Sequence, residues 1–296
     1  MSPRWLRSLA AAPLALGLVV GMAPAALAFV PYVYIPRAQE LEGSGLGIAQ
    51  AATRLLRLGQ AEDAARLAAL AVQLIPNDPR GWVLLAEAQL RSNQTKQAGQ
   101  SLARAKQLDP RNPGILFAQG SLALRDSQPK QAILYLEQGL KLDAKNAGAY
   151  FDLGNAHILL NNPAAALVSF EKASGLRKGF WEAINNQALV LFEMGRNREA
   201  IERWNQALQI KANSAEPSLA LAAALNGSGN VEEALRLAQK ALTGEPSYVL
   251  ESYQKEQLWG AKLRAATKKL LSRPELKPVV ERALANAGTT AESTNE

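Results

Sequence analysis

The chain has 296 residues, of which 48% are hydrophobic and 6% aromatic, and it contains no cysteine. The lack of cysteine excludes disulfides, thiolate metal sites and a cysteine nucleophile, and the many small apolar side chains favour closely packed helices over a sheet. The formal charge of +7 is spread along the chain, so it does not form the continuous basic stripe that is typical of nucleic-acid binding.

Residues 1–28 are typical of a targeting segment. Arg4 and Arg7 precede an apolar run, and small residues before Phe29 predict cleavage after Ala28. We therefore expect a signal peptide and an exported protein. Two alternatives remain open: an uncleaved membrane anchor through residues 8–28, although the apolar run is short of the ~20 residues that a span needs, or a buried helix.

Residues 29–44 predict an extended linker, because Pro31 and Pro36 oppose a regular helix and the residues between them are mostly β-branched or aromatic. The linker is either a flexible leader or a strip that docks on the rest of the chain. The glycines of residues 43–47 predict a hinge. They do not predict a nucleotide site, because no strand precedes them and no lysine follows at the required place.

A strict period of 34 residues begins at Gly45 and divides the chain into six units: 45–78, 79–112, 113–146, 147–180, 181–214 and 215–248. The eighth, twentieth and twenty-seventh places hold only Ala or Gly, as in Gly154, Ala166 and Ala173 of the fourth unit. A larger side chain at such places would force two packed helices apart.

Large residues and turn residues recur at other fixed places of each unit. The twenty-fourth place holds Leu102, Leu136, Phe170 and Trp204 in the second to fifth units, which predicts a filled core. The fifteenth place predicts the break between two helices, because Gly and Asn tolerate the left-handed conformation that closes a helix; its residues are Gly59, Asn93, Ser127, Asn161, Gly195 and Gly229.

This pattern resembles the tetratricopeptide repeat, a helix–turn–helix unit of 34 residues. The resemblance covers residues 45–248 and implies an all-α fold: a right-handed superhelical solenoid of six tandem units, in which the first helix of each unit lines a concave groove. Because no unit can bury its apolar face alone, the array also needs caps.

Residues 249–286 predict C-terminal capping helices. Within them, residues 249–272 keep one broad apolar face and predict a single long helix stacked on the last unit, followed after Pro274 by a shorter helix over 277–286. We expect residues 287–296 to be disordered. The many Lys and Arg residues of this end are either a solvated surface or a patch for an acidic partner or a membrane.

The sequence does not predict catalysis, a metal site or a cofactor. The one histidine, His157, stands at a place where the family carries a core residue, and Asp152 is not on the same helical face. Without cysteine, the common zinc ligand sets cannot be assembled. The expected protein is therefore not an enzyme.

The resemblance implies which residues line the groove. An apolar strip is expected from Val83, Phe117 and Phe151, and the other candidate peptide-binding residues are polar or lie further along the groove: Glu87, Ser121, Asp152, Asn155, Asn185, Asn186 and Leu219.

Asn155 and Asn186 match the asparagines that, in peptide-binding members of the family, hold the backbone of an extended ligand. A side-chain amide can both donate to a carbonyl and accept from an N–H. The alternative is an ordinary pair of polar residues that bond within the protein. The lysine and arginine that clamp a C-terminal carboxylate in chaperone-binding members are replaced by Phe151, Glu216 and Ala220.

These features predict a protein-interaction scaffold that binds an extended segment of a protein partner. Two alternatives are a structural or self-associating protein whose groove is filled by its own N-terminal strip, and a membrane-anchored assembly factor that touches the membrane through its N-terminus or its basic C-terminal helix. The leader, the repeats and residues 254–260 are similar to exported repeat proteins of cyanobacteria and lumenal proteins of chloroplasts. That similarity implies the periplasm or thylakoid lumen, and a role in assembling a membrane or photosynthetic complex.

Overall fold

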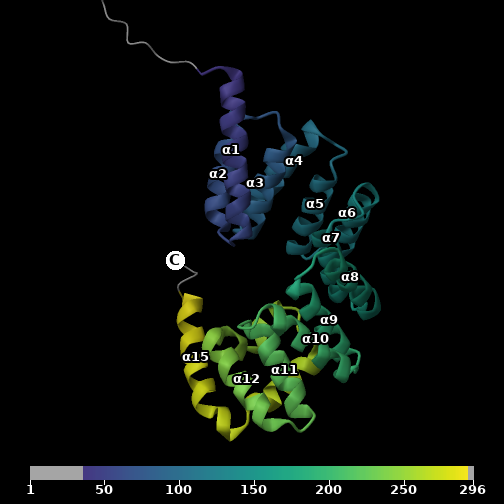
Figure 1. Ribbon diagram of the computed structural model, residues 1–296, viewed down its shortest axis with the longest axis vertical. Coiled ribbons are helices and arrows are strands. Elements are labelled where there is room, and N and C mark those ends of the chain that lie inside the picture. Colours follow the sequence, from purple (N-terminus) through teal and green to yellow (C-terminus); the bar gives the residue numbers. More distant parts are fainter. Residues whose placement is uncertain (1–35, 293–296) are drawn as a thin grey trace, which may run out of the picture. The chain divides into compact units, whose positions relative to one another are not determined.

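Twelve helices follow one another from Ala38 to Gly244, in the order that the 34-residue period predicts. In the computed structural model, which describes residues 36–292, each repeat unit is a pair of helices (Figure 1). The first helices are α1 (Ala38–Arg57), α3 (Pro79–Arg91), α5 (Pro113–Arg125), α7 (Ala147–Leu159), α9 (Trp181–Glu193) and α11 (Ala215–Gly227). The second helices are α2 (Ala61–Leu74), α4 (Thr95–Leu108), α6 (Pro129–Leu142), α8 (Pro163–Leu176), α10 (Asn197–Ile210) and α12 (Val231–Gly244).

The turns between paired helices lie where the fifteenth places predict them. Gly59, Gly195 and Gly229 have positive φ, and so do Asn93, Ser127 and Asn161. Side-chain caps then start several first helices: Asp78, Asn112 and Asn146 accept hydrogen bonds from backbone N–H groups of the following turn.

The small residues lie at close helix contacts, as predicted. A Cβ atom added to Gly154 would lie 2.5 Å from the ring of Phe170, and one added to Gly120 would lie 2.6 Å from Leu136. Both large partners are fully buried. The helices of a unit can therefore approach only because these places lack side chains.

The beginning of the array differs from the prediction. Helix α1 begins at Ala38, so residues 38–44 are helical rather than extended, and the expected hinge at 43–47 lies inside the helix. Gly43 and Gly47 have open space around them. The targeting segment and residues 29–35 lie outside the described residues.

The C-terminal part also differs. The single long helix expected over 249–272 is instead two helices, α13 (Glu251–Glu256) and α14 (Ala261–Leu271), with a short 3-10 turn, η1 (Pro246–Val249), before them. A second 3-10 turn, η2 (Pro274–Leu276), leads into α15 (Lys277–Glu292). Thus α15 is longer than predicted and includes residues 287–292, which we expected to be disordered.

The two parts of this end have different places in the fold. The turn η1 and helix α15 pack on α12, the last second helix, and so provide the expected cap. Helix α14 instead packs against α9 and α11. Over residues 36–292, no helix has both the length and the apolar character needed to cross a membrane.

Candidate functional site

The candidate residues lie on the first helices, whose shared surface we call the first-helix face. Successive first helices contact each other directly from α1 to α3, α5 and α7. On this face, the candidates of the second to fourth units are half-buried: Val83, Glu87, Phe117, Ser121, Phe151, Asp152 and Asn155. Those of the fifth and sixth units, namely Asn185, Asn186 and Leu219, are 0%, 9% and 0% exposed.

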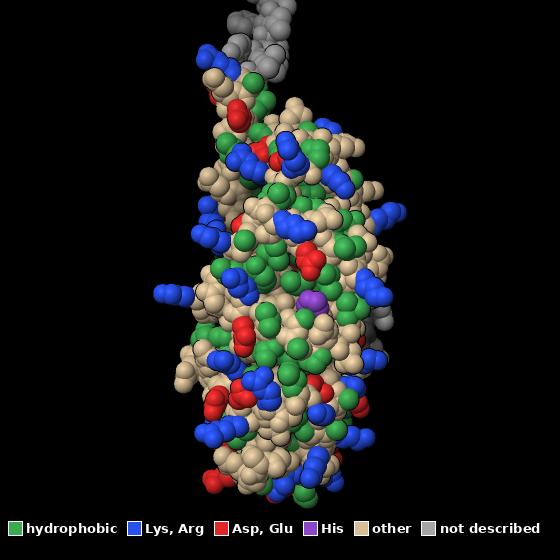
Figure 2. All heavy atoms as spheres, turned by 90° about the vertical axis from the view of Figure 1, so that its right-hand side faces the viewer, with side chains coloured by type: hydrophobic (Ala, Val, Ile, Leu, Met, Phe, Trp, Pro, Cys, Tyr) green, Lys and Arg blue, Asp and Glu red, His purple; other side chains and the backbone are tan. Residues whose placement is uncertain are grey.

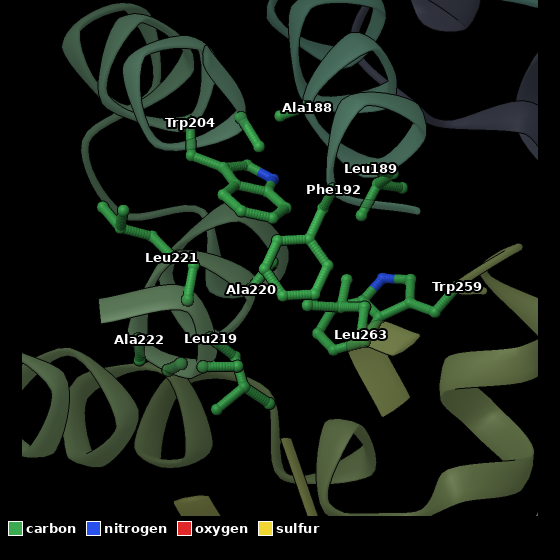
Figure 3. Close-up of a cluster of buried hydrophobic side chains, with 14 of the residues drawn as sticks. Ala188, Leu189, Phe192, Trp204, Leu219, Ala220, Leu221, Ala222, Trp259 and Leu263 are labelled. Atoms are coloured by element: carbon green, nitrogen blue, oxygen red, sulfur yellow. The ribbon is translucent and has the colours of Figure 1, made fainter. Parts of the chain in front are cut away.

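The contrast coincides with the packing of α14, which lies in residues 250–271, against α9 and α11 of the fifth and sixth units. We call residues 250–271 the covering segment. Figure 3 shows Trp259 and Leu263 of this segment beside Phe192 of α9 and near Leu219 of α11, and both are almost fully buried. The segment therefore occupies part of the predicted groove, and the prediction that Asn185, Asn186 and Leu219 line an open binding surface is wrong, because all three are buried.

Glu193, the last residue of α9, holds the start of α14. Its carboxylate accepts hydrogen bonds from the backbone N–H groups of Lys262 at 3.2 Å and Leu263 at 2.9 Å. The Lys262 Nζ donates to the Glu193 carbonyl oxygen at 2.6 Å. A Cβ atom at Gly260 would collide with the Glu193 side chain. An anionic cap at a helix N-terminus is favourable, and glycine at 260 permits the approach.

Glu216 of α11 is the second anchor of the covering segment. Its Oε1 accepts a hydrogen bond of 3.0 Å from Nε1 of Trp259. Burial raises the pKa of Glu216 to about 6, although hydrogen bonds with Trp259, Asn185 and Tyr248 act in the opposite direction. The sequence did not reveal this contact, because the helical period of residues 249–272 identifies an apolar face but not the surface that it meets.

The predicted asparagine pair is brought together. Asn186 Nδ2 donates to Asn155 Oδ1 at 3.2 Å, and Asn185 Nδ2 donates to Asn186 Oδ1 at 3.3 Å. The three amides thus form a chain from the covered α9 to the half-buried Asn155 on α7. This bonding agrees with the alternative that the pair bonds within the protein, and it leaves Asn155 as the member nearest to solvent.

A second polar group joins three consecutive units. Ser121 of α5 donates to Asp152 of α7 at 2.5 Å, and Glu87 and Arg91 of α3 form an ion pair at 2.8 Å. Burial raises the pKa of Asp152 to about 6; the Ser121 hydrogen bond and the positive charge of Arg91 lower it, and the negative charge of Glu87 raises it. The candidates Glu87, Ser121 and Asp152 therefore form one electrostatically connected group.

The predicted apolar strip is packed more deeply than expected. The Phe151 ring centroid lies 5.6 Å from that of Phe170 and 5.1 Å from that of Phe180. The Phe117 ring lies over Gly139, where an added Cβ would be 2.5 Å away. These rings thus pack within the repeat array, while Val83, Phe117 and Phe151, the residues of the predicted strip, stay half-buried.

The first-helix face also carries a pocket that the sequence analysis did not single out. It has a volume of 430 Å³ and is lined by Leu46, Gln50 and Thr53 of α1 and by Arg80 and Leu84 of α3, among others. These residues occupy the second, sixth or ninth places of their units. The same periodic places that identified the other candidates would have identified these residues.

Two further features noted in the sequence are His157 and the basic residues of the C-terminal end. His157 is half-buried on a surface with many hydrophobic side chains (Figure 2), and burial lowers its pKa. Lys262 bonds Glu193, and Arg264 pairs with Glu251 at 2.8 Å, whereas four other basic residues of this end are exposed: Lys268, Lys269, Lys277 and Arg282. Among the described residues, no group of three or more His, Asp or Glu side chains is arranged to hold a metal ion.

Comparisons with known proteins agree with the repeat. Family models described as tetratricopeptide repeat match residues 55–116 and 117–176, and one described as TPR repeat matches residues 188–229. Among curated proteins, no match is found.

Several solved structures have a similar fold. The structure of the APC/C hetero-tetramer Cut9-Hcn1 gives a TM-score of 0.63 at 14% identity, and the match covers 83% of this chain and 46% of that chain. Pseudomonas aeruginosa pilF gives 0.57 at 17% identity, with 78% and 99% covered. A thermophilic TPR protein of Thermus thermophilus gives 0.54 at 21% identity, with 62% and 99% covered. All three support the all-α repeat fold.

Proposed function

Because this chain belongs to the tetratricopeptide-repeat family, we propose that it is a protein-interaction scaffold that holds an extended segment of a partner protein on the first-helix face of units one to four. The observation that carries the proposal is the difference in exposure along this face. Candidates in the second to fourth units are half-buried, whereas the covering segment buries those in the fifth and sixth.

The side chains on the first-helix face of units one to four are suited to binding a peptide rather than to catalysis. This face combines the pocket at Leu46 and Leu84, the group around Ser121 and Asp152, and the amide of Asn155. Amide, hydroxyl and carboxylate groups can pair with the N–H and C=O groups of an extended backbone, and apolar pockets can take alternate side chains. We infer a binding role rather than a catalytic one.

The proposal is tested by affinity purification of the full chain from its native extract, comparing wild type with Asn155→Ala. The control is Asn205→Ala, which removes an exposed amide from α10, a second helix outside the face. We expect Asn155→Ala to reduce recovery of the specific partner severalfold while Asn205→Ala leaves it unchanged. Equal recovery with all three proteins would overturn the placement on this face.

We also propose that the protein is exported and that residues 1–28 are its signal peptide, with the periplasm or thylakoid lumen as its location. The arrangement of Arg4, Arg7 and the small residues before Phe29 supports this proposal. Mass spectrometry of the mature protein tests it. A mature chain that begins at Phe29 is expected, and one that retains residues 8–28 would support the membrane-anchored alternative instead.

A further inference from the structure

A small pocket marks the place where the open part of the first-helix face meets the covering segment. Its volume is 320 Å³, and its apolar lining includes Ile158 of α7, Leu189 and Val190 of α9, Met194 after α9, and Leu258 of the covering segment. The pocket is therefore built by two repeat units and the C-terminal segment together. A repeat array without this segment would lack one wall.

Two residues of the pocket lining lie about one helical turn beyond the asparagine pair. Ile158 lies three residues after Asn155 on α7, and Leu189 lies three residues after Asn186 on α9. Residues three or four apart in a helix are neighbours on one face. A backbone that bonds the Asn155 amide would thus place a nearby side chain at the mouth of the pocket.

Leu258 has an unusual backbone conformation for its residue type. Its φ is +63°, and the other non-glycine residues with positive φ in the described chain are the polar Asn93, Ser127 and Asn161. Glycine adopts this conformation without steric cost, whereas a bulky residue is strained there. Residue 258 is therefore a leucine although its backbone conformation favours glycine, and this leucine lines the pocket.

The charge at the pocket favours an uncharged ligand group. Glu193 is the one ionisable residue of the lining, and its carboxylate already accepts two backbone N–H bonds at the start of α14. The volume is at the small end for ligand pockets, which span about 300–1,000 Å³. Met194, 40% exposed, adds a flexible apolar side chain at the site.

We propose that this pocket is the anchor subsite of the binding face, and that it takes one bulky aliphatic or aromatic side chain of the partner's extended segment. The inference rests on the proposed function, since it assumes that a peptide lies along units one to four. It adds the chemical requirement that the bound segment carries a large apolar residue where it reaches the covering segment.

The test uses random-sequence linear peptides displayed on phage, selected against the full chain. The variant is Leu258→Gly, which removes the pocket wall and relieves the backbone strain, so its thermal stability is expected to equal or exceed that of wild type. The matched control is Ser127→Gly, which relieves the same type of strain at an exposed turn away from the pocket.

Wild type and Ser127→Gly are expected to select peptides that share a bulky apolar residue, and Leu258→Gly is expected to bind those peptides about tenfold more weakly. Peptides that bind all three proteins equally, with no shared apolar residue, would overturn the anchor subsite and leave the binding face intact. If no peptide binds wild type, the proposed function fails and the anchor subsite fails with it.

Discussion

The indole Nε1 of Trp259 donates a hydrogen bond of 3.0 Å to Oε1 of Glu216, and this bond joins the covering segment to the first helix of the last repeat unit. The two residues are far apart in sequence, and both are needed for the contact. The bond links the stability of the C-terminal end to the protonation state of the Glu216 carboxyl group on the first-helix face.

The first prediction concerns this bond. Trp259→Phe keeps an aromatic ring but removes the donor, so Glu216 loses a partner in a site with little access to water. We expect the free energy of unfolding to fall by about 1.5–3 kcal/mol, the usual range for a hydrogen bond to a charged group. Urea denaturation measures it. Trp82→Phe is the control, because the Trp82 Nε1 bond to the Pro76 carbonyl is exposed. Equal losses in the two variants would contradict the prediction.

The second prediction concerns pH. Folding raises the pKa of Glu216 from an ordinary 4.5 to about 6. The folded protein thus holds this proton more tightly than the unfolded chain, and stability is lost as the pH rises through that interval. We expect Glu216→Gln, which imitates the protonated acid, to gain about 2 kcal/mol relative to wild type between pH 4 and pH 8.

Urea denaturation at a series of pH values measures this gain as a difference between the two proteins, so that other titrating groups cancel. Glu199→Gln is the control, since Arg196 lowers the pKa of this exposed carboxyl and the sign of its pH dependence is therefore opposite. A difference between Glu216→Gln and wild type that is independent of pH would contradict the prediction.

The third prediction concerns packing in the fourth unit. Gly154→Ala introduces a Cβ only 2.5 Å from the buried Phe170 ring, so overpacking is expected to lower the free energy of unfolding by about 1–3 kcal/mol. Gly175→Ala, on α8 of the same unit, meets nothing within 4 Å and is expected to stabilise the protein by about 0.5–1 kcal/mol. Thermal unfolding of both variants measures the two effects, and a common sign would contradict this account.

The fourth prediction concerns the start of α14. Gly260→Ala would push the Glu193 side chain away from the N–H groups of Lys262 and Leu263. We expect amide hydrogen exchange to accelerate in α14 before it changes in α5 or α7, because the lost contact is local. Gly244→Ala has open space and serves as the control. Uniform acceleration along the whole chain would instead indicate a global loss of stability.

The repeat fold could be predicted because its signals are local and periodic. Gly154 and Ala166, like the residues at the same places of the other units, mark close contacts between helices, and Asn161 marks a turn. The spacing of these residues therefore predicts where each helix begins and ends. The pairing of Asn155 and Asn186 was also predictable, since the repeat pattern places the ninth residue of one unit and the sixth residue of the next on the first helices of neighbouring units.

The covering segment could not be predicted, because a helical period shows which side of a helix is apolar and not what that side meets. Trp259 and Leu263 fit a terminal cap as well as they fit the first-helix face. The packing of α14 on α9 and α11, where Asn185 and Leu219 lie, is a long-range contact of this kind. The left-handed conformation of Leu258 has no sequence signal either, since most such positions hold Gly or Asn.

Because the covering segment lies on the fifth and sixth units, the first-helix face is covered towards its C-terminal end. A partner segment that lies along the first-helix face, as proposed, would stop where α14 packs against α9 and α11. The covered end would then fix where a bound segment stops, and fewer than six units would be available to a partner. Shortening the chain before residue 250 would uncover α9 and α11 and so enlarge the exposed apolar surface, besides removing the cap on α12.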